Sequence, residues 1–131
     1  MGGLEEHLKR RALVFFRNAM RNFDDGDYDV SMFNLEQAVQ LYIKYLIYLK
    51  LGDFRKSHDL KVLFKDLLRL YGDCGLKDFY RVYSDKLRIL SDAYILSRYI
   101  PVEYDREEVQ DMINVVKKLM EVFKCLENMT S

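Results

Sequence analysis

Four residues of this 131-residue sequence have side chains suited to binding a phosphate group or a base: Lys44, His58, Arg98 and Tyr99. Lys44 lies in an otherwise apolar run, so its ammonium group must reach water or an anionic partner. Arg98 carries a planar guanidinium that fits phosphate oxygens, and Tyr99 beside it could stack on a base. His58 is the one residue of the four whose side chain titrates near neutral pH and could move a proton in a reaction.

Each of these residues also has a purely structural explanation. Arg98 lies near the end of an expected helix, where a cation stabilises helix carbonyl groups or pairs with an acid such as Asp92. Ten tyrosines and no tryptophan make a core or interface position equally suitable for Tyr99. His58 can be an ordinary polar residue in the first turn of a helix. The residue types alone leave these alternatives open.

The elements that must position these side chains are helices. Apolar residues recur at helical spacing in five segments, and no segment has the sustained two-residue alternation of a strand. The expected helices cover residues 4–23, 28–51, 57–71, 76 to 99 or 100, and 105 to about 126. Ser57 is expected to cap the third helix, and Asp105 with Glu108 has the spacing of a capping box at the start of the fifth.

The second segment is apolar around most of its circumference, which predicts a central helix or one that also serves a subunit interface. Short connections between long helices favour antiparallel neighbours. We therefore predict an all-α fold, an up-down antiparallel bundle of four long helices plus one short helix. The length fits a single helical domain over residues 1–131.

The charges of the chain balance, with 21 basic and 21 acidic residues. This balance argues against a protein that coats nucleic acid by bulk electrostatics. The charges are unevenly spread, because residues 44–69 hold seven basic and three acidic side chains. This basic stretch is either a set of solvated helix faces or a cleft that receives phosphate. In the second case Ser57 at a helix N-terminus, with Lys56 beside it, would form an anion site.

Two cysteines, Cys74 and Cys125, are too few for a disulfide framework, and we expect reduced thiols in an intracellular protein. Their spacing builds no metal site. The N-terminal residues lack the basic segment and apolar core of a secretory signal. The most apolar stretch, residues 41–51, is interrupted by lysines and is far shorter than the roughly 20 residues of a membrane span. We expect a cytoplasmic protein without a metal ion or a membrane contact.

Three stretches of the sequence share the order and spacing of one known family. They are residues 26–39 (GDYDVSMFNLEQAV), residues 44–48 (KYLIY) followed by SHDL at 57–60, and residues 93–101 (AYILSRYIP) followed by the capped helix at Asp105. Together they resemble the HEPN domain, a helical domain of higher eukaryotes and prokaryotes. The resemblance covers roughly residues 11–123.

The resemblance implies a helical bundle that dimerises, with a minimal nucleotidyltransferase as a frequent partner in toxin–antitoxin systems. Many HEPN domains are metal-independent RNases whose motif is an arginine followed, after four to six residues, by a histidine. Arg98 matches the arginine, whereas positions 103–105 hold Glu103, Tyr104 and Asp105. The catalytic histidine is missing.

We therefore predict a nucleotide- or RNA-binding homodimer that works with a nucleotidyltransferase partner. Lys44, His58, Arg98 and Tyr99 are its candidate binding residues. No catalytic residue is assigned, and no cofactor is expected other than a nucleotide ligand. Two alternatives remain open. One is a metal-independent RNase that uses Arg98 with His58, and the other is a non-catalytic homodimeric adaptor bundle.

Overall fold

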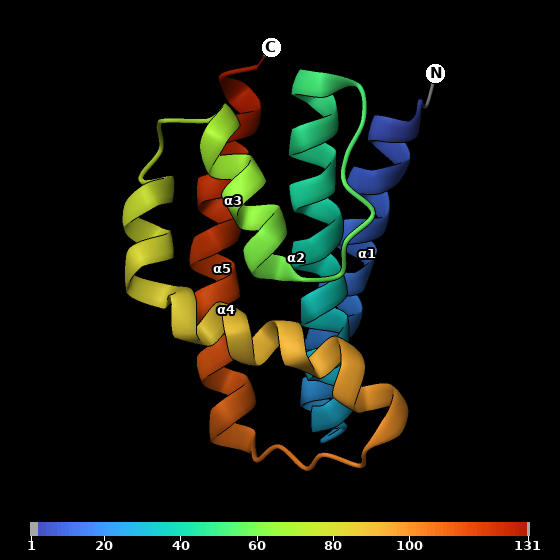
Figure 1. The fold of residues 1–131 in the computed structure, drawn as a ribbon. Helices are drawn as coiled ribbons and strands as arrows, with labels where there is room; N and C mark the ends of the chain where they lie inside the picture. The colour runs from blue at the N-terminus through green and yellow to red at the C-terminus, as the bar shows by residue number, and fades with distance from the viewer. Residues whose placement is uncertain (1–2, 131) are drawn as a thin grey trace.

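The computed structural model describes residues 3–130, which form five helices and the connections between them (Figure 1). They are α1 (Leu4–Asp24), α2 (Tyr28–Leu51), α3 (Leu60–Leu70), α4 (Leu76–Tyr99) and α5 (Arg106–Asn128). The described residues contain no strand, so the predicted all-α helical bundle is confirmed. The outermost residues of the predicted 1–131 domain, 1–2 and 131, lie outside the described part.

Local sequence signals set most of these boundaries. At the start of α5 the Asp105 carboxylate accepts a hydrogen bond from the Glu108 amide, and the Glu108 carboxylate accepts one from the Asp105 amide, which confirms the predicted capping box. α2 begins and ends at the predicted residues. It ends at Gly52, whose φ of 71° lies in the left-handed region that glycine adopts without strain.

The predicted N-cap of α3, Ser57, is wrong by two residues. The N-cap is Asp59, whose carboxylate accepts a hydrogen bond from the Lys61 amide at 2.9 Å. Ser57 instead accepts a hydrogen bond from the Asp59 amide at 3.1 Å, within the connection that precedes the helix. Both residue types cap helices well, and Asp59 is the one adjacent to the first helical residue. His58 consequently lies before α3 and not in its first turn.

α2 is the helix around which the other four pack. It contacts α1, α3, α4 and α5, and most of its residues are buried. Its apolar circumference is therefore covered within one chain, which confirms the central-helix interpretation of its sequence. No helix in the described residues is long and apolar enough to cross a membrane.

The direction of two elements departs from a simple up-down arrangement. The connection between α2 and α3 runs back along the bundle, so α3 rises in the same general direction as α2 (Figure 1). α4 is kinked at Tyr83, whose φ of −112° and ψ of 16° are not helical. The second half of α4 then crosses the bundle (Figure 1), which brings its last turns to the first half of α2.

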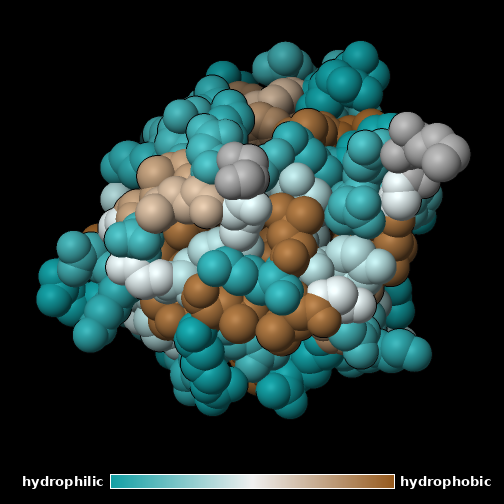
Figure 2. Space-filling model, turned by 90° about the horizontal axis from the view of Figure 1, so that it is seen from above, coloured by the Kyte–Doolittle hydropathy of each residue, from teal (hydrophilic) through white to brown (hydrophobic). Residues whose placement is uncertain are grey.

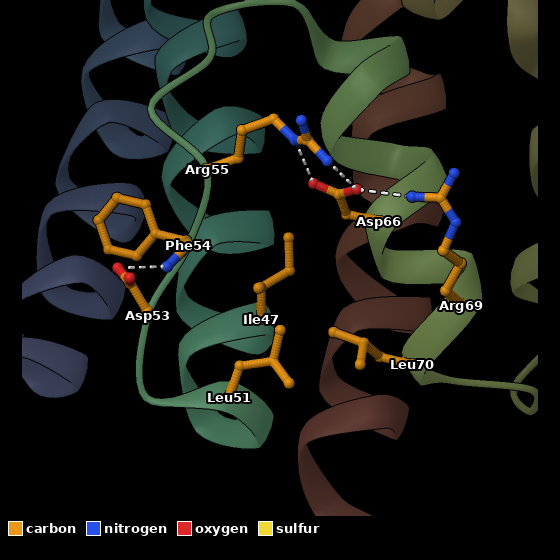
Figure 3. Close-up of a pocket in the computed structure, with 8 residues that line it drawn as sticks. All are labelled: Ile47, Leu51, Asp53, Phe54, Arg55, Asp66, Arg69 and Leu70. Carbon is orange, nitrogen blue, oxygen red and sulfur yellow. Dashed lines mark hydrogen bonds and ion pairs between the residues drawn. The ribbon is translucent and has the colours of Figure 1, made fainter.

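An ion pair attaches the α2–α3 connection to α3. Arg55 donates from Nε and Nη2 to the two carboxylate oxygens of Asp66, at 2.9 and 3.2 Å (Figure 3). The hydrogen bonds and charge of Arg55 outweigh the effect of burial and lower the pKa of Asp66 below its ordinary value. This attachment fixes the course of the segment that carries His58.

Glu127 joins three helices near the C-terminal end of α5. Its carboxylate accepts hydrogen bonds from the hydroxyls of Tyr42 and Tyr45, at 2.7 and 3.0 Å, and pairs with Lys9 at 2.5 Å. Burial alone would raise the pKa of Glu127, but these three donors lower it below the ordinary value. The ionised carboxylate therefore holds α1, α2 and α5 together.

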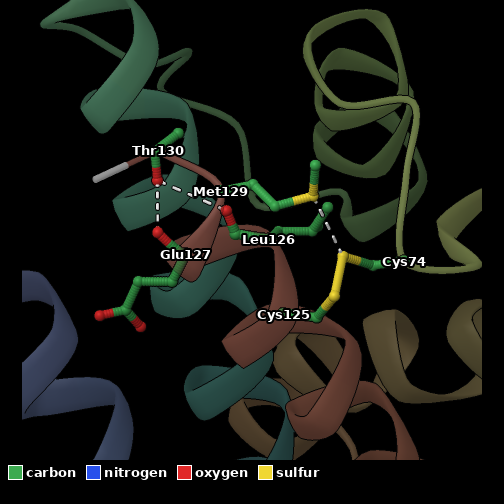
Figure 4. Close-up of a disulfide and its surroundings, with 6 residues drawn as sticks. All are labelled: Cys74, Cys125, Leu126, Glu127, Met129 and Thr130. Carbon is green, nitrogen blue, oxygen red and sulfur yellow. Dashed lines mark hydrogen bonds between the residues drawn. A yellow bond between two sulfur atoms is a disulfide. The ribbon is translucent and has the colours of Figure 1, made fainter.

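Cys74 and Cys125 form a disulfide (Figure 4), so the prediction of two reduced thiols is wrong. Cys74 lies in the short connection between α3 and α4 with a φ of 64°, and Cys125 lies in the last turns of α5. Their Cα atoms are 5.9 Å apart, a separation that a disulfide spans. The bend at Cys74 creates this proximity between residues 51 positions apart, and nothing in their sequence spacing indicated it.

Candidate functional site

Three residues from two elements converge at the second half of α4. The His58 ring stacks on the Tyr94 ring, with centroids 4.5 Å apart and planes inclined by 17°. The guanidinium carbon of Arg98 also lies 4.5 Å from the centroid of the Tyr94 ring. The imidazole and the guanidinium are therefore separated by no more than twice that distance. We call His58, Tyr94 and Arg98 the Tyr94 cluster.

The fold brings these residues together in two ways. Tyr94 and Arg98 are four residues apart on α4, so their side chains project from the same helix face. His58 belongs to the α2–α3 connection, which brings its ring against that of Tyr94. Phe33 of α2 also packs beside Tyr94, at a centroid distance of 6.2 Å. Without the kink in α4, these last turns would not cross to α2.

Three polar side chains of α2, at positions 36, 40 and 44, lie next to the cluster. Gln40 donates to the carboxylate of Glu36 at 2.8 Å, and its amide oxygen accepts from the Lys44 ammonium at 3.0 Å. The same oxygen lies 3.4 Å from Nδ1 of His58. We call Glu36, Gln40 and Lys44 the α2 polar row. It connects a buried carboxylate to the imidazole of the cluster.

The groups of this row are removed from water. Glu36 is fully buried and Lys44 is 7% exposed. Burial raises the pKa of Glu36 to about 7, although hydrogen bonds from Gln40 and Gln37 and the charges of Lys44 and Arg98 act in the opposite direction. Burial lowers the pKa of Lys44, and the charge of Glu36 opposes that effect. The row therefore holds a carboxyl group whose charge changes near neutral pH.

Two surface cavities border the Tyr94 cluster. One, of about 280 Å³, includes His58 in its lining, and the other, of about 270 Å³, includes Arg98. The first cavity is lined by His58, Asp59, Lys61, Arg88, Ser91, Asp92 and Ile95. Lys61 and Arg88 share this lining with the carboxylates of Asp59 and Asp92. The first amides of α3 already have acceptors, because Leu60 donates to the Ser91 hydroxyl and Lys61 donates to the Asp59 carboxylate. The second cavity lies between Arg98 and the start of α2.

The structure brings together three of the four predicted site residues. His58 and Arg98 contact the same ring, and Lys44 reaches His58 through Gln40. The Lys44 ammonium is buried against Gln40 and lies 5.5 Å from the centroid of the Phe54 ring. It therefore contacts the site through Gln40 and is not exposed in either cavity. Tyr99 is 77% exposed, and no ring contact or hydrogen bond joins it to another described residue.

The sequence interpretation did not assign Glu36, Gln40 or Tyr94 to the site. A signal for the first two was present. Glu36, Gln40 and Lys44 follow one another at four-residue intervals on a helix that is otherwise apolar on that side. Such polar residues share one helix face and must pair with each other when that face is buried.

Comparisons with known proteins identify the family of the chain. A search of curated proteins and a search of solved structures returned no match. A scan against family models matched the HEPN domain over residues 5–126, which includes every residue of the Tyr94 cluster and the α2 polar row. HEPN membership points to a function that involves nucleotides or RNA. With nearly its whole length covered by that match, the chain belongs to the HEPN domain family.

Proposed function

We propose that the Tyr94 cluster binds the phosphate groups of RNA or of a nucleotide. The observation that carries this proposal is the convergence of His58 and Arg98 on one ring, with a cavity beside each of them. Arg98 offers a planar fork of donors that matches phosphate oxygens. Lys61 and Arg88 in the cavity beside His58 add further donors for phosphate oxygens, next to the carboxylates of Asp59 and Asp92.

The proposal extends to the partners implied by the family. We propose a homodimer and a minimal nucleotidyltransferase partner, in a cytoplasmic toxin–antitoxin-type pair. Exposed apolar side chains around Arg98 support the homodimer, because an apolar surface of this kind is stabilised by burial. They are Val30, Ile95 and Ile100. Sedimentation that shows a monomer at every protein concentration would contradict the dimer, and a neighbouring reading frame without a nucleotidyltransferase would contradict the partner.

Replacing Arg98 by alanine is expected to weaken RNA binding about tenfold or more. The loss of one charge-assisted hydrogen bond to phosphate is worth about 1.5–3 kcal/mol. Titration of the protein with octauridylate, followed by the amide resonances of α4 and the α2–α3 connection, measures this change. The same titration with uridine monophosphate separates RNA binding from nucleotide binding.

The matched control for Arg98→Ala is Arg11→Ala. Arg11 is an exposed arginine whose guanidinium carbon lies 5.9 Å from the centroid of the Phe15 ring, four residues further along α1, so it also stacks on an aromatic ring of its own helix. Loss of this stack leaves the proposed site intact, so RNA affinity should be unchanged. Equal affinities in the wild type and Arg98→Ala would contradict the proposal.

A second candidate function is favoured by the contact of both His58 and Arg98 with the Tyr94 ring. In a metal-independent RNase reaction, the His58 imidazole would take the proton of a ribose 2′-hydroxyl. The 2′-oxygen then attacks the adjacent phosphorus, the bond to the 5′-oxygen breaks, and that oxygen takes up a proton from water. Arg98 would stabilise the charge on the phosphorus-bound oxygens. In this reaction His58, from the α2–α3 connection, would take the role that the histidine after the arginine has in the family motif.

Cleavage of single-stranded RNA in the presence of a metal chelator tests this second function. We expect His58→Ala and Arg98→Ala each to reduce the cleavage rate by at least about a hundredfold, the usual contribution of a general base or a charge-stabilising group. His7→Ala is the control, because His7 is the other histidine and lies in the first turns of α1. Cleavage that survives Arg98→Ala, or no cleavage by the wild type, would exclude the RNase.

A further inference from the structure

A further cavity, bordered by α2 and α3, lies apart from the Tyr94 cluster. Its volume is about 430 Å³, within the range of cavities that bind small molecules. It is lined by Ile47, Leu51, Asp53, Phe54, Arg55, Asp66, Arg69 and Leu70 (Figure 3). We call it the α2–α3 cavity. It shares no lining residue with the two cavities beside the Tyr94 cluster, so the function proposed above does not account for it.

One side of the α2–α3 cavity is apolar. Ile47 is buried at its base, Leu70 and Phe54 are half-buried, and Leu51 at its mouth is 63% exposed. Leu51 is the last residue of α2, and this end of the molecule also carries Leu4 and Met129 as exposed apolar residues (Figure 1). Figure 2 shows apolar side chains gathered on this face among hydrophilic ones. An apolar group bound here would cover surface that is otherwise in contact with water.

One side of the cavity carries a net positive charge, although the Asp53 carboxylate elsewhere in the lining makes the lining as a whole neutral. Arg55 and Arg69 both donate to the single carboxylate of Asp66, so the three residues together carry one net positive charge. Each guanidinium uses only part of its five N–H donors in these bonds. Both arginine side chains are more than half exposed, and their remaining donors can reach an anion without breaking the pairs.

Asp53 is the one other charged residue of the lining. Its carboxylate accepts a hydrogen bond from the Phe54 amide at 2.8 Å. In Figure 3 it lies beside Phe54, well separated from Asp66 and Arg69 on the far side of the cavity. The two sides of the cavity therefore differ in polarity, with a cationic group on one side and an apolar surface next to it.

We propose that the α2–α3 cavity binds an apolar chain that ends in one carboxylate, the chemistry of a medium-chain fatty acid. The carboxylate would lie against the outer donors of Arg55 and Arg69, whose planar forks match its two oxygens. The single negative charge balances the net charge of the Arg55–Asp66–Arg69 group. The hydrocarbon chain would lie over Leu51, Phe54 and Leu70.

Titration of the full chain with octanoate tests this proposal. The resonances of Leu51, Phe54 and Leu70 should shift and saturate, whereas those of the Tyr94 cluster should not move. 1-Octanol and octyltrimethylammonium provide the same chain without a negative charge. We expect octanoate to bind at least about tenfold more tightly than either, because only octanoate gains the charge-assisted hydrogen bonds.

Variants test the charged part and the apolar part of the proposed site separately. Arg69→Gln, which keeps the Arg55–Asp66 pair that attaches the connection, should weaken octanoate binding about tenfold and leave octanol binding unchanged. Leu51→Ser should weaken the binding of both, and because Leu51 is largely exposed this change spares the core. Arg81→Gln is the matched control, since Arg81 forms an exposed ion pair with Asp78 elsewhere, on α4.

Four results would overturn the proposal. The first three are shifts that rise linearly without saturation, equal binding of octanoate and octanol, and equal octanoate binding by Arg69→Gln and by Arg81→Gln. A short peptide with an apolar C-terminal residue should bind more weakly than octanoate, and tighter binding of the peptide would assign the cavity to a protein partner instead. None of these outcomes depends on RNA binding at the Tyr94 cluster.

Discussion

Reduction of the disulfide between Cys74 and Cys125 is expected to lower the free energy of unfolding by about 4 kcal/mol. The bond closes a loop across a sequence separation of 51 residues, and the conformational entropy that the unfolded chain gains when such a loop is opened has this size. For a chain of this length, the loss corresponds to a decrease in Tm of roughly 10–20 °C. Thermal unfolding followed by circular dichroism, with and without dithiothreitol, measures it.

The control is the double variant Cys74→Ser and Cys125→Ser. It should unfold close to the temperature of the reduced wild type and should not respond to dithiothreitol. Thiol titration of the denatured, unreduced wild type should find no free thiol, because both described cysteines are in the disulfide. Two titratable thiols, or a Tm that dithiothreitol leaves unchanged, would show that the chain has the reduced cysteines its sequence led us to expect.

The second large effect concerns the buried carboxyl group of Glu36. Its pKa is raised from 4.5 to about 7, so the folded state keeps a proton that the unfolded chain has already lost. Stability contributed by this proton is fully present below about pH 4.5 and is lost as the pH rises through about 7. The shift corresponds to about 3 kcal/mol at most.

Replacing Glu36 by glutamine should remove this pH dependence. The amide stays neutral, so we expect the variant to exceed the wild type in stability by up to about 3 kcal/mol near pH 8.5 and to match it near pH 4.5. Lys44 keeps its hydrogen bond to Gln40. Half-buried Gln37, one of the two donors to Glu36, can turn to water when only one oxygen remains to accept. Urea unfolding across this pH range measures both curves.

Glu127→Gln is the control of opposite sign. The pKa of Glu127 is lowered by its donors Lys9, Tyr42 and Tyr45. Its contribution is present above the ordinary carboxyl pKa and is lost as the pH falls through the lowered value. The Glu127→Gln variant should therefore be less stable than the wild type at neutral pH, with the difference shrinking in acid. Parallel stability curves for wild type and Glu36→Gln would contradict the assignment of the Glu36 proton.

Much of the fold followed from local patterns in the sequence. Helical spacing located all five helices, and the boundaries of α2 and the capping box of α5 depended on neighbouring residues alone. The start of α3 was predicted less well because two good capping residues, Ser57 and Asp59, lie two positions apart. Which one caps depends on where the chain leaves the bundle, and that is a tertiary property.

The candidate site could be predicted only in part from the sequence. Arg98 and His58 were singled out by their chemistry and by resemblance to a family, and the structure placed both against Tyr94. Tyr99 was chosen because it neighbours Arg98 in the chain, yet successive residues of a helix point to different faces. Glu36 was overlooked because burial, which raises its pKa, is a property of the packed bundle.

The sequence by itself therefore determined the helices, the central position of α2 and the residue types available for binding phosphate. These depend on interactions between residues within about one helical turn of each other, or on the apolar pattern of one helix. Only the tertiary structure decided that α4 bends at Tyr83, that His58 meets Arg98 on one ring, and that Cys74 meets Cys125. The two contacts join residues that are distant in the chain, and their proximity depends on how the helices pack. The bend in α4 likewise accompanies the packing of its second half against α2.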